Sequence, residues 1–148
     1  MGLKMTMLGA DGFDSPFFNK IGGSSLDNVY FTTHFSVDDQ DPLVQTFVND
    51  YKSKYKELPS AQAALAYDAI GMISYAIEHN PKPFENFNQK LFSVKNFKGV
   101  TGTISFLPDR NVSKDATIIK INNNKNSFVE KYSASSPTLT TSTTKTPG

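Results

Sequence analysis

An apolar run at residues 3–8 leads directly into a loop at residues 9–12, in which two glycines bracket Asp11. The run predicts a buried strand, and the glycines allow a sharp turn and the close approach of a ligand. A short helix at 14–21 and a strand at 29–33 follow, which is the order of a βαβ unit with parallel strands. The sequence therefore predicts an α/β fold with a parallel sheet and flanking helices. Asp11 then lies at the carboxyl end of a strand, where open α/β sheets bind ligands.

Three more helices are predicted from capping residues and apolar spacing. Asp41-Pro42 has an acid at the N-cap and proline in the first turn, and apolar residues at helical spacing continue to Tyr55. The second of these helices runs from about Pro59-Ser60 to His79. Because nearly all of its residues are apolar or small, we expect it to be buried against several elements. The third is predicted at about 83–94.

After residue 96 the apolar pattern changes from helical to strand periodicity. Residues 99–106 predict an extended segment kinked by glycine, and residues 116–121 and 127–132 predict a hairpin with a turn at 122–125. Residues 133–148 are rich in Ser and Thr and nearly free of apolar side chains. Such a segment buries too little surface to order itself, so we expect a disordered tail.

Composition excludes several classes of function. The 148 residues include 15 basic and 14 acidic side chains, for a formal net charge of +1, and the lysines form no basic stripe. We therefore expect no nucleic-acid partner. No apolar run is long enough for a membrane-spanning helix. The absence of cysteine excludes disulfides, thiol catalysis and cysteine-ligated zinc. Because no phosphate loop or metal-ligand spacing is present, the sequence predicts neither a cofactor nor a metal site.

Five polar residues stand out as candidates for a site. Asp11 is expected to be free. Asp14 or Ser15 is expected to cap the following helix, and the alternative for Asp14 is to pair with Asp11 as the two carboxylates of a hydrolase. Gln62 lies in the first turn of the apolar helix, and helix ends commonly face a cleft. Asp68 lies within the same helix and is expected to bond a neighbouring backbone, since an unpaired buried polar group is costly. His34 follows the strand at 29–33 and is expected to line a cleft or a hinge.

The order of four segments resembles the branched-chain amino-acid-binding proteins of ABC importers. The similarity extends from residue 2 to about residue 132, in the family's order and approximate spacing. Chains of that family are much longer, so this sequence is similar to their C-terminal part only. The four segments are Leu8-Gly-Ala-Asp-Gly-Phe-Asp-Ser-Pro16, Asn28-Val-Tyr-Phe-Thr-Thr-His-Phe-Ser36, Ala63-Ala-Leu-Ala-Tyr-Asp-Ala69 and Phe97-Lys-Gly-Val-Thr-Gly-Thr-Ile-Ser-Phe106.

The resemblance implies a type I periplasmic binding fold, in which two α/β lobes joined by three crossing strands close on a ligand like a flytrap. By position, residues 1–33 are similar to the end of the second lobe. Residues 34–110 match the returning part of the first lobe, and residues 111–132 match the closing strands of the second. The crossings are expected near Thr33-His34 and at residues 108–113.

The resemblance also implies a binding site. Asp11 matches the acid that holds the ligand's α-ammonium group in the family, which agrees with the choice made from the residues alone. Phe13 matches a position that is usually aromatic and is expected to form a wall of the pocket. Gln62 matches a position that relatives often fill with an aromatic residue, so this chain departs from the family there. The groups that hold the ligand's carboxylate belong to the N-terminal part of the family fold.

The function implied is the substrate-binding component of an amino-acid importer, present as a C-terminal fragment and without catalytic activity. Its partners would be an amino acid as the small-molecule ligand and the membrane permease subunits of the importer. The full-length protein would work outside the cytoplasm and meet the membrane only through an N-terminal anchor that this chain lacks. Two alternatives are a ligand-sensing domain of a receptor with the same fold and a small hydrolase that uses Asp11 and Asp14.

Overall fold

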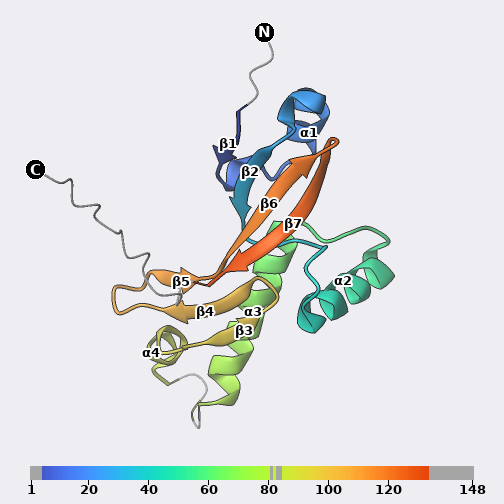
Figure 1. The fold of residues 1–148 in the computed structure, drawn as a ribbon. Helices are drawn as coiled ribbons and strands as arrows, with labels where there is room; N and C mark the ends of the chain where they lie inside the picture. Colours follow the sequence, from blue (N-terminus) through green and yellow to red (C-terminus); the bar gives the residue numbers. More distant parts are fainter. Residues whose placement is uncertain (1–4, 81, 83–84, 134–148) are drawn as a thin grey trace, which may run out of the picture.

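The computed structural model describes residues 5–80, 82 and 85–133, which form two units, each with its own sheet (Figure 1). The four-stranded unit contains helix α1 (Pro16–Gly22) and a sheet with the strand order β1-β2-β6-β7. Its strands are β1 (Met7–Gly9), β2 (Val29–Thr33), β6 (Ala116–Asn122) and β7 (Lys125–Tyr132). Short 3-10 helices, η1 (Asp11–Phe13) and η2 (Gly23–Leu26), flank α1 in the chain.

The βαβ unit predicted at the start of the chain is confirmed. Strands β1 and β2 pair in parallel, and α1 begins with Ser15 at its N-cap, where the side chain accepts a hydrogen bond from the Phe17 amide. The rest of the sheet is antiparallel, so the sheet is mixed. The prediction of a buried strand at residues 3–8 is wrong for the described residues: β1 lies at the sheet edge, and Leu8 is 81% exposed.

The hairpin predicted near the C-terminus is also confirmed, as β6 and β7. Its tip, Asn123-Asn124, has positive φ angles of 49° and 60°, the geometry that asparagine accepts in tight hairpin turns. Alternate residues of β2 and β6 point to one face of the sheet. There they form the core of the four-stranded unit with η2, and the buried residues are Leu26, Val29, Phe31, Ile119 and Ile121.

The three-stranded unit contains the remaining helices and a second sheet in the order β3-β4-β5. Helices α2 and α3 begin where their N-caps predict: the side chain of Asp41 accepts a hydrogen bond from the Leu43 amide, and that of Ser60 from the Ala63 amide. The elements are α2 (Pro42–Tyr55), α3 (Ala61–Glu78), α4 (Phe87–Phe92), β3 (Phe97–Gly99), β4 (Gly102–Phe106) and β5 (Val112–Lys114).

Helix α3 does not have the environment that its apolar sequence predicts. One face packs on α2 through Ala61 and Ala64, in a core that includes Phe47 and Val100. The opposite face is open, and Ile70 is 62% exposed. Helix α3 also contacts α4 and β3, so the prediction that it packs against several elements is confirmed, whereas the expectation that most of its sides are buried is wrong for the part of the chain that the structure describes. The spacing of apolar residues indicates which sides of a helix are suited to packing. It does not indicate whether another element lies against each of those sides.

Two further predictions need correction. The segment predicted as extended at 99–106 is instead the turn and second strand of a hairpin over residues 97–106, because the chain turns at Val100-Thr101 and Gly102 takes a φ of 113°. Helix α4 is shorter than the predicted 83–94, since Asn86 has a left-handed φ of 55° just before its first turn.

Some predictions fall on parts of the chain outside the described residues. Residues 3–4 of the first strand, residues 83–84 of the third helix and residues 134–148 of the tail belong to this group.

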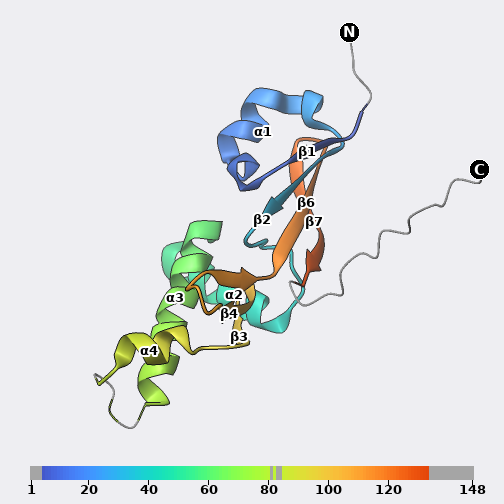
Figure 2. The ribbon, with the colours of Figure 1, turned by 90° about the vertical axis from the view of Figure 1, so that its left-hand side faces the viewer.

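The two units lie end to end, and the chain passes between them twice (Figure 2). The first passage follows β2 and leads through residues 34–41 to α2, and the second is Asp115, between β5 and β6. In both views the N-terminal end of α3 is the end nearer to the four-stranded sheet. The assignment of residues 1–33, 34–110 and 111–132 to lobes stays a prediction.

Candidate functional site

A cavity of about 200 Å³ lies where the two units meet. We call it the junction cavity. Three segments of the chain form it: the start of η1, the end of β2 with the residue after it, and the passage from β5 to β6. The residues that line it are Asp11, Thr32, Thr33, His34, Lys114, Asp115 and Ala116.

Asp11 lies just beyond the carboxyl end of β1, as predicted from the sequence, and its side chain is 64% exposed. Its Oδ2 atom lies 3.5 Å from Nε2 of His34, which extends from the end of β2. His34, expected to line a cleft or a hinge, therefore does line the junction cavity. A carboxylate with one long contact of this kind keeps most of its capacity to accept hydrogen bonds.

Asp14 holds the loop that carries Asp11. The buried hydroxyl of Thr33 donates a hydrogen bond of 2.6 Å to Oδ2 of Asp14, which ties the loop to the end of β2. The helix N-cap is Ser15, one of the two predicted candidates, so Asp14 does not cap the helix. A carboxylate that accepts a short hydrogen bond from a buried threonine is suited to positioning, because the bond holds the loop against the end of β2.

Lys114 and Asp115 form the far side of the junction cavity, and sequence reasoning missed both. Nζ of Lys114 donates to the Thr101 carbonyl at 2.6 Å and makes longer contacts of 3.3 Å and 3.4 Å with the carbonyls of Asp115 and His34. Burial lowers the pKa of the Lys114 ammonium to about 8, against the opposing effect of the Asp68 and Asp115 carboxylates. One feature of the sequence could have revealed these two residues: they form a Lys-Asp pair directly beside the predicted crossing at residues 108–113.

The structure does not bring Phe13 and Gln62 to this cavity. The Phe13 ring stacks on that of Phe18 with centroids 4.3 Å apart and covers Gly9, where a Cβ would collide with it. Phe13 thus packs against the core of the four-stranded unit. Gln62 is exposed in the first turn of α3. It lines neither the junction cavity nor the larger groove between α2, α3 and β3. Their roles as pocket walls stay predictions.

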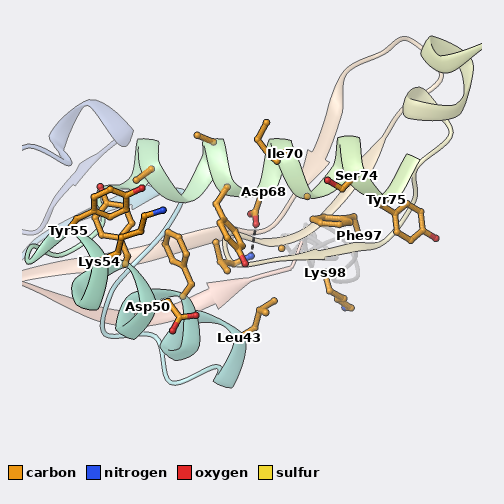
Figure 3. Close-up of a pocket in the computed structure, with 18 of the residues that line it drawn as sticks. Leu43, Asp50, Lys54, Tyr55, Asp68, Ile70, Ser74, Tyr75, Phe97 and Lys98 are labelled. Carbon is orange, nitrogen blue, oxygen red and sulfur yellow. Dashed lines mark hydrogen bonds between the residues drawn. The ribbon is translucent and has the colours of Figure 1, made fainter. Parts of the chain in front are cut away.

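A larger groove of about 840 Å³ runs between α2, α3 and β3 (Figure 3). Its walls are mainly aromatic and aliphatic, with Lys54 and Tyr55 towards one end and Tyr75 and Phe97 towards the other. A large apolar pocket is the usual first candidate for a binding site, provided that a few polar groups converge in it.

The buried polar group of this groove, the Asp68 carboxylate, is held by hydrogen bonds to the protein itself. Asp68, 2% exposed, accepts hydrogen bonds from the amides of Val100 and Thr101 and from the Thr101 hydroxyl, at 2.6–2.8 Å. This confirms the prediction that Asp68 bonds a neighbouring backbone. The junction cavity, with the exposed carboxylate of Asp11, is therefore the candidate site. Among the described residues, no group of three or more histidine or acidic side chains is placed to hold a metal ion.

Comparison with known families assigns the chain to one family. The family described as periplasmic binding protein matches residues 1–126. The chain belongs to this family. A search of curated proteins found no match. No helix in the part of the chain that the structure describes is long and apolar enough to cross a membrane.

Similar solved structures support the assignment to this family. The leucine-binding protein LivK from Thermotoga maritima is 29% identical with a TM-score of 0.75, over 89% of this chain and 38% of its own. The branched-chain amino-acid-binding protein LivJ from Streptococcus pneumoniae, solved in complex with isoleucine, is 32% identical with a TM-score of 0.71, over 89% and 38%. The resemblance to branched-chain amino-acid-binding proteins and their type I fold is thus confirmed. The chain spans 38% of the length of these relatives.

Proposed function

We propose that this chain forms part of the substrate-binding component of an ABC importer for amino acids of the branched-chain type. The observation that carries the proposal is the Asp11 carboxylate, exposed beyond the end of β1 and facing His34 across the junction cavity. Family membership and the isoleucine complex of the similar Streptococcus pneumoniae protein support the same ligand class. The role of the chain is to capture a ligand without catalysing a reaction.

Asp11 is the anchor for the α-ammonium group of the ligand. A hydrogen bond between an ammonium and a carboxylate is about twice as strong as a neutral one, so a single acid suffices to select amines. The loop that carries Asp11 is held by the bond between Thr33 and Asp14, which fixes the direction of the carboxylate before the ligand arrives. This preorganisation reduces the entropy cost of binding.

The second wall of the pocket comes from the part of the relatives' length that this chain does not span. That wall holds the ligand's carboxylate, and closure of the two lobes buries the amino acid between them. The whole protein works outside the cytoplasm and delivers its ligand to the permease subunits of the importer. By itself the described chain offers one side of the pocket, so leucine, isoleucine and valine bind to it with millimolar or weaker affinity.

The test is an Asp11→Asn substitution in a protein that joins this chain to the N-terminal part of the Streptococcus pneumoniae relative. We expect isoleucine affinity to fall by about 1.5–3 kcal/mol, the range for hydrogen bonds to charged groups, since asparagine keeps the shape and loses the charge. Isothermal titration calorimetry measures the change. Asp50→Asn, on the exposed surface of α2, is the matched control. Equal affinities of the parent and the Asp11→Asn protein would remove Asp11 from the site.

A further inference from the structure

Lys114 lies where the two units meet, and its three carbonyl partners come from different parts of the junction. The Thr101 carbonyl belongs to the turn between β3 and β4, in the three-stranded unit. The His34 carbonyl follows β2 at the first passage between the units, and the Asp115 carbonyl lies at the second. Because Lys114 is the last residue of β5 and Asp115 is its neighbour in the sequence, the contact with the His34 carbonyl is the one of the three that ties the three-stranded unit to the end of β2.

The contacts of Lys114 belong to a continuous path across the molecule. On the far side of Thr101, its amide and hydroxyl donate to Asp68 of α3. On the other side, the residue whose carbonyl Lys114 contacts is His34, and the His34 imidazole faces Asp11. The path thus begins at a buried acid in one unit and ends at the candidate ligand anchor in the other.

Lys114 is half-buried, so part of the hydration of its ammonium group is lost. Burial lowers the pKa of Lys114 to about 8, and the Lys131 ammonium acts in the same direction. The carboxylates of Asp68 and Asp115 act in the opposite direction and favour the charged form. Near neutral pH the ammonium group is therefore protonated, and its partial desolvation is offset by its carbonyl partners.

We propose that Lys114 is a positioning residue of the junction: its ammonium group fixes the orientation of the two units relative to each other. Through the His34 carbonyl it also fixes the imidazole beside Asp11. The first part concerns the chain itself and is independent of any ligand, while the second rests on the proposed function of Asp11.

Another contact crosses the same junction and has to be separated from Lys114. Lys131 of β7 forms an ion pair of 2.6 Å with Asp39, which lies between β2 and α2. This pair remains in a Lys114→Met protein, and the Lys114 contacts remain in a Lys131→Met protein. Comparison of the two substitutions therefore assigns the orientation to one contact or the other.

The experiment measures the distance between the units directly. Because the sequence contains no cysteine, two introduced cysteines are the only labelling sites. Ser24 in η2 and Ser53 in α2 are exposed and lie in different units, so Ser24→Cys and Ser53→Cys carry the spin labels. Pulsed dipolar spectroscopy then gives the distribution of label-to-label distances in the full chain.

We expect a narrow distribution in the labelled parent and a roughly twofold wider one in Lys114→Met, because the units then sample several orientations. Lys125→Met, at the exposed end of the β6–β7 hairpin, removes a lysine elsewhere and leaves the distribution narrow. Lys114→Arg keeps a cation at the junction and gives an intermediate width. An unchanged width in Lys114→Met overturns the proposal, as does a distribution that widens in Lys131→Met alone.

A pH series separates positioning from a general loss of stability. Above about pH 8 Lys114 loses its charge and one N–H donor. The parent distribution therefore widens towards that of Lys114→Met, which itself does not change. Stability moves the other way: because the folded pKa lies below the unfolded value, the unfolded state binds the proton more strongly from pH 8 to 10.5. The parent thus gains stability relative to Lys114→Met over that range. A parent width that is independent of pH counts against the proposal.

Discussion

Replacement of Asp68 by alanine lowers the free energy of unfolding by about 3–5 kcal/mol, the range for breaking a buried charged interaction. Asp68 is 2% exposed and accepts three hydrogen bonds from Val100 and Thr101. Alanine leaves two amides and a hydroxyl without their acceptor in a place that water does not reach freely. It also removes a negative charge that favours the ammonium of Lys114. Urea denaturation followed by circular dichroism measures the change.

Asp50→Ala is the control for this prediction. Asp50 is also a helical aspartate that lines the groove between α2 and α3, but it is exposed. Exposed substitutions of this kind usually change stability by less than about 0.5 kcal/mol. If Asp68→Ala and Asp50→Ala cost the same, the three hydrogen bonds do not hold α3 to the turn between β3 and β4.

The parts of this fold that local chemistry determines were predictable from the sequence. Asp41 and Ser60 mark the starts of α2 and α3 because a side-chain oxygen at the N-cap satisfies a free amide within three residues. The tip of the β6–β7 hairpin was predictable because asparagine tolerates a positive φ. In each case the deciding interaction lies within a few residues of the chain.

The errors concern interactions with distant neighbours. The apolar residues of β1 and of the outer face of α3 predict burial, but Leu8 and Ile70 are exposed in the described chain. Apolar character alone does not reveal which neighbour a surface meets. Phe13 illustrates the same limit: a ring beside the ligand anchor predicts a pocket wall, whereas its contacts with Phe18 and Gly9 place it against a core.

The candidate site was partly predictable for the same reason. Asp11 could be found because its signal, an acid between glycines after a strand, is local. Lys114 could not, because its partners Thr101 and His34 lie 13 and 80 residues away in the sequence. A half-buried lysine has no sequence pattern that distinguishes it from an exposed one, and the role of Lys114 depends on the turn and the passages that fold around it.

The role of Asp68 also makes a prediction for its neighbour Gly99. A Cβ on Gly99 would lie 2.5 Å from Cγ of Asp68 and 2.7 Å from its Oδ1. The carboxylate cannot move away without losing hydrogen bonds to Val100 and Thr101. We therefore expect Gly99→Ala to lower the free energy of unfolding by about 3 kcal/mol, the upper end of the range for overpacking. Backbone strain adds nothing, because Gly99 is not among the residues with a positive φ.

A double-mutant cycle isolates this contact. In an Asp68→Ala background the space taken by the carboxylate is empty, so the Cβ that Gly99→Ala introduces meets no obstacle and the substitution costs close to nothing there. The two substitutions are then non-additive by about 3 kcal/mol, near the upper limit found for residues in direct contact. Urea denaturation of the parent, both single variants and the double variant gives this coupling. Additive effects would mean that the turn between β3 and β4 moves away from α3, and that the carboxylate does not hold it in place.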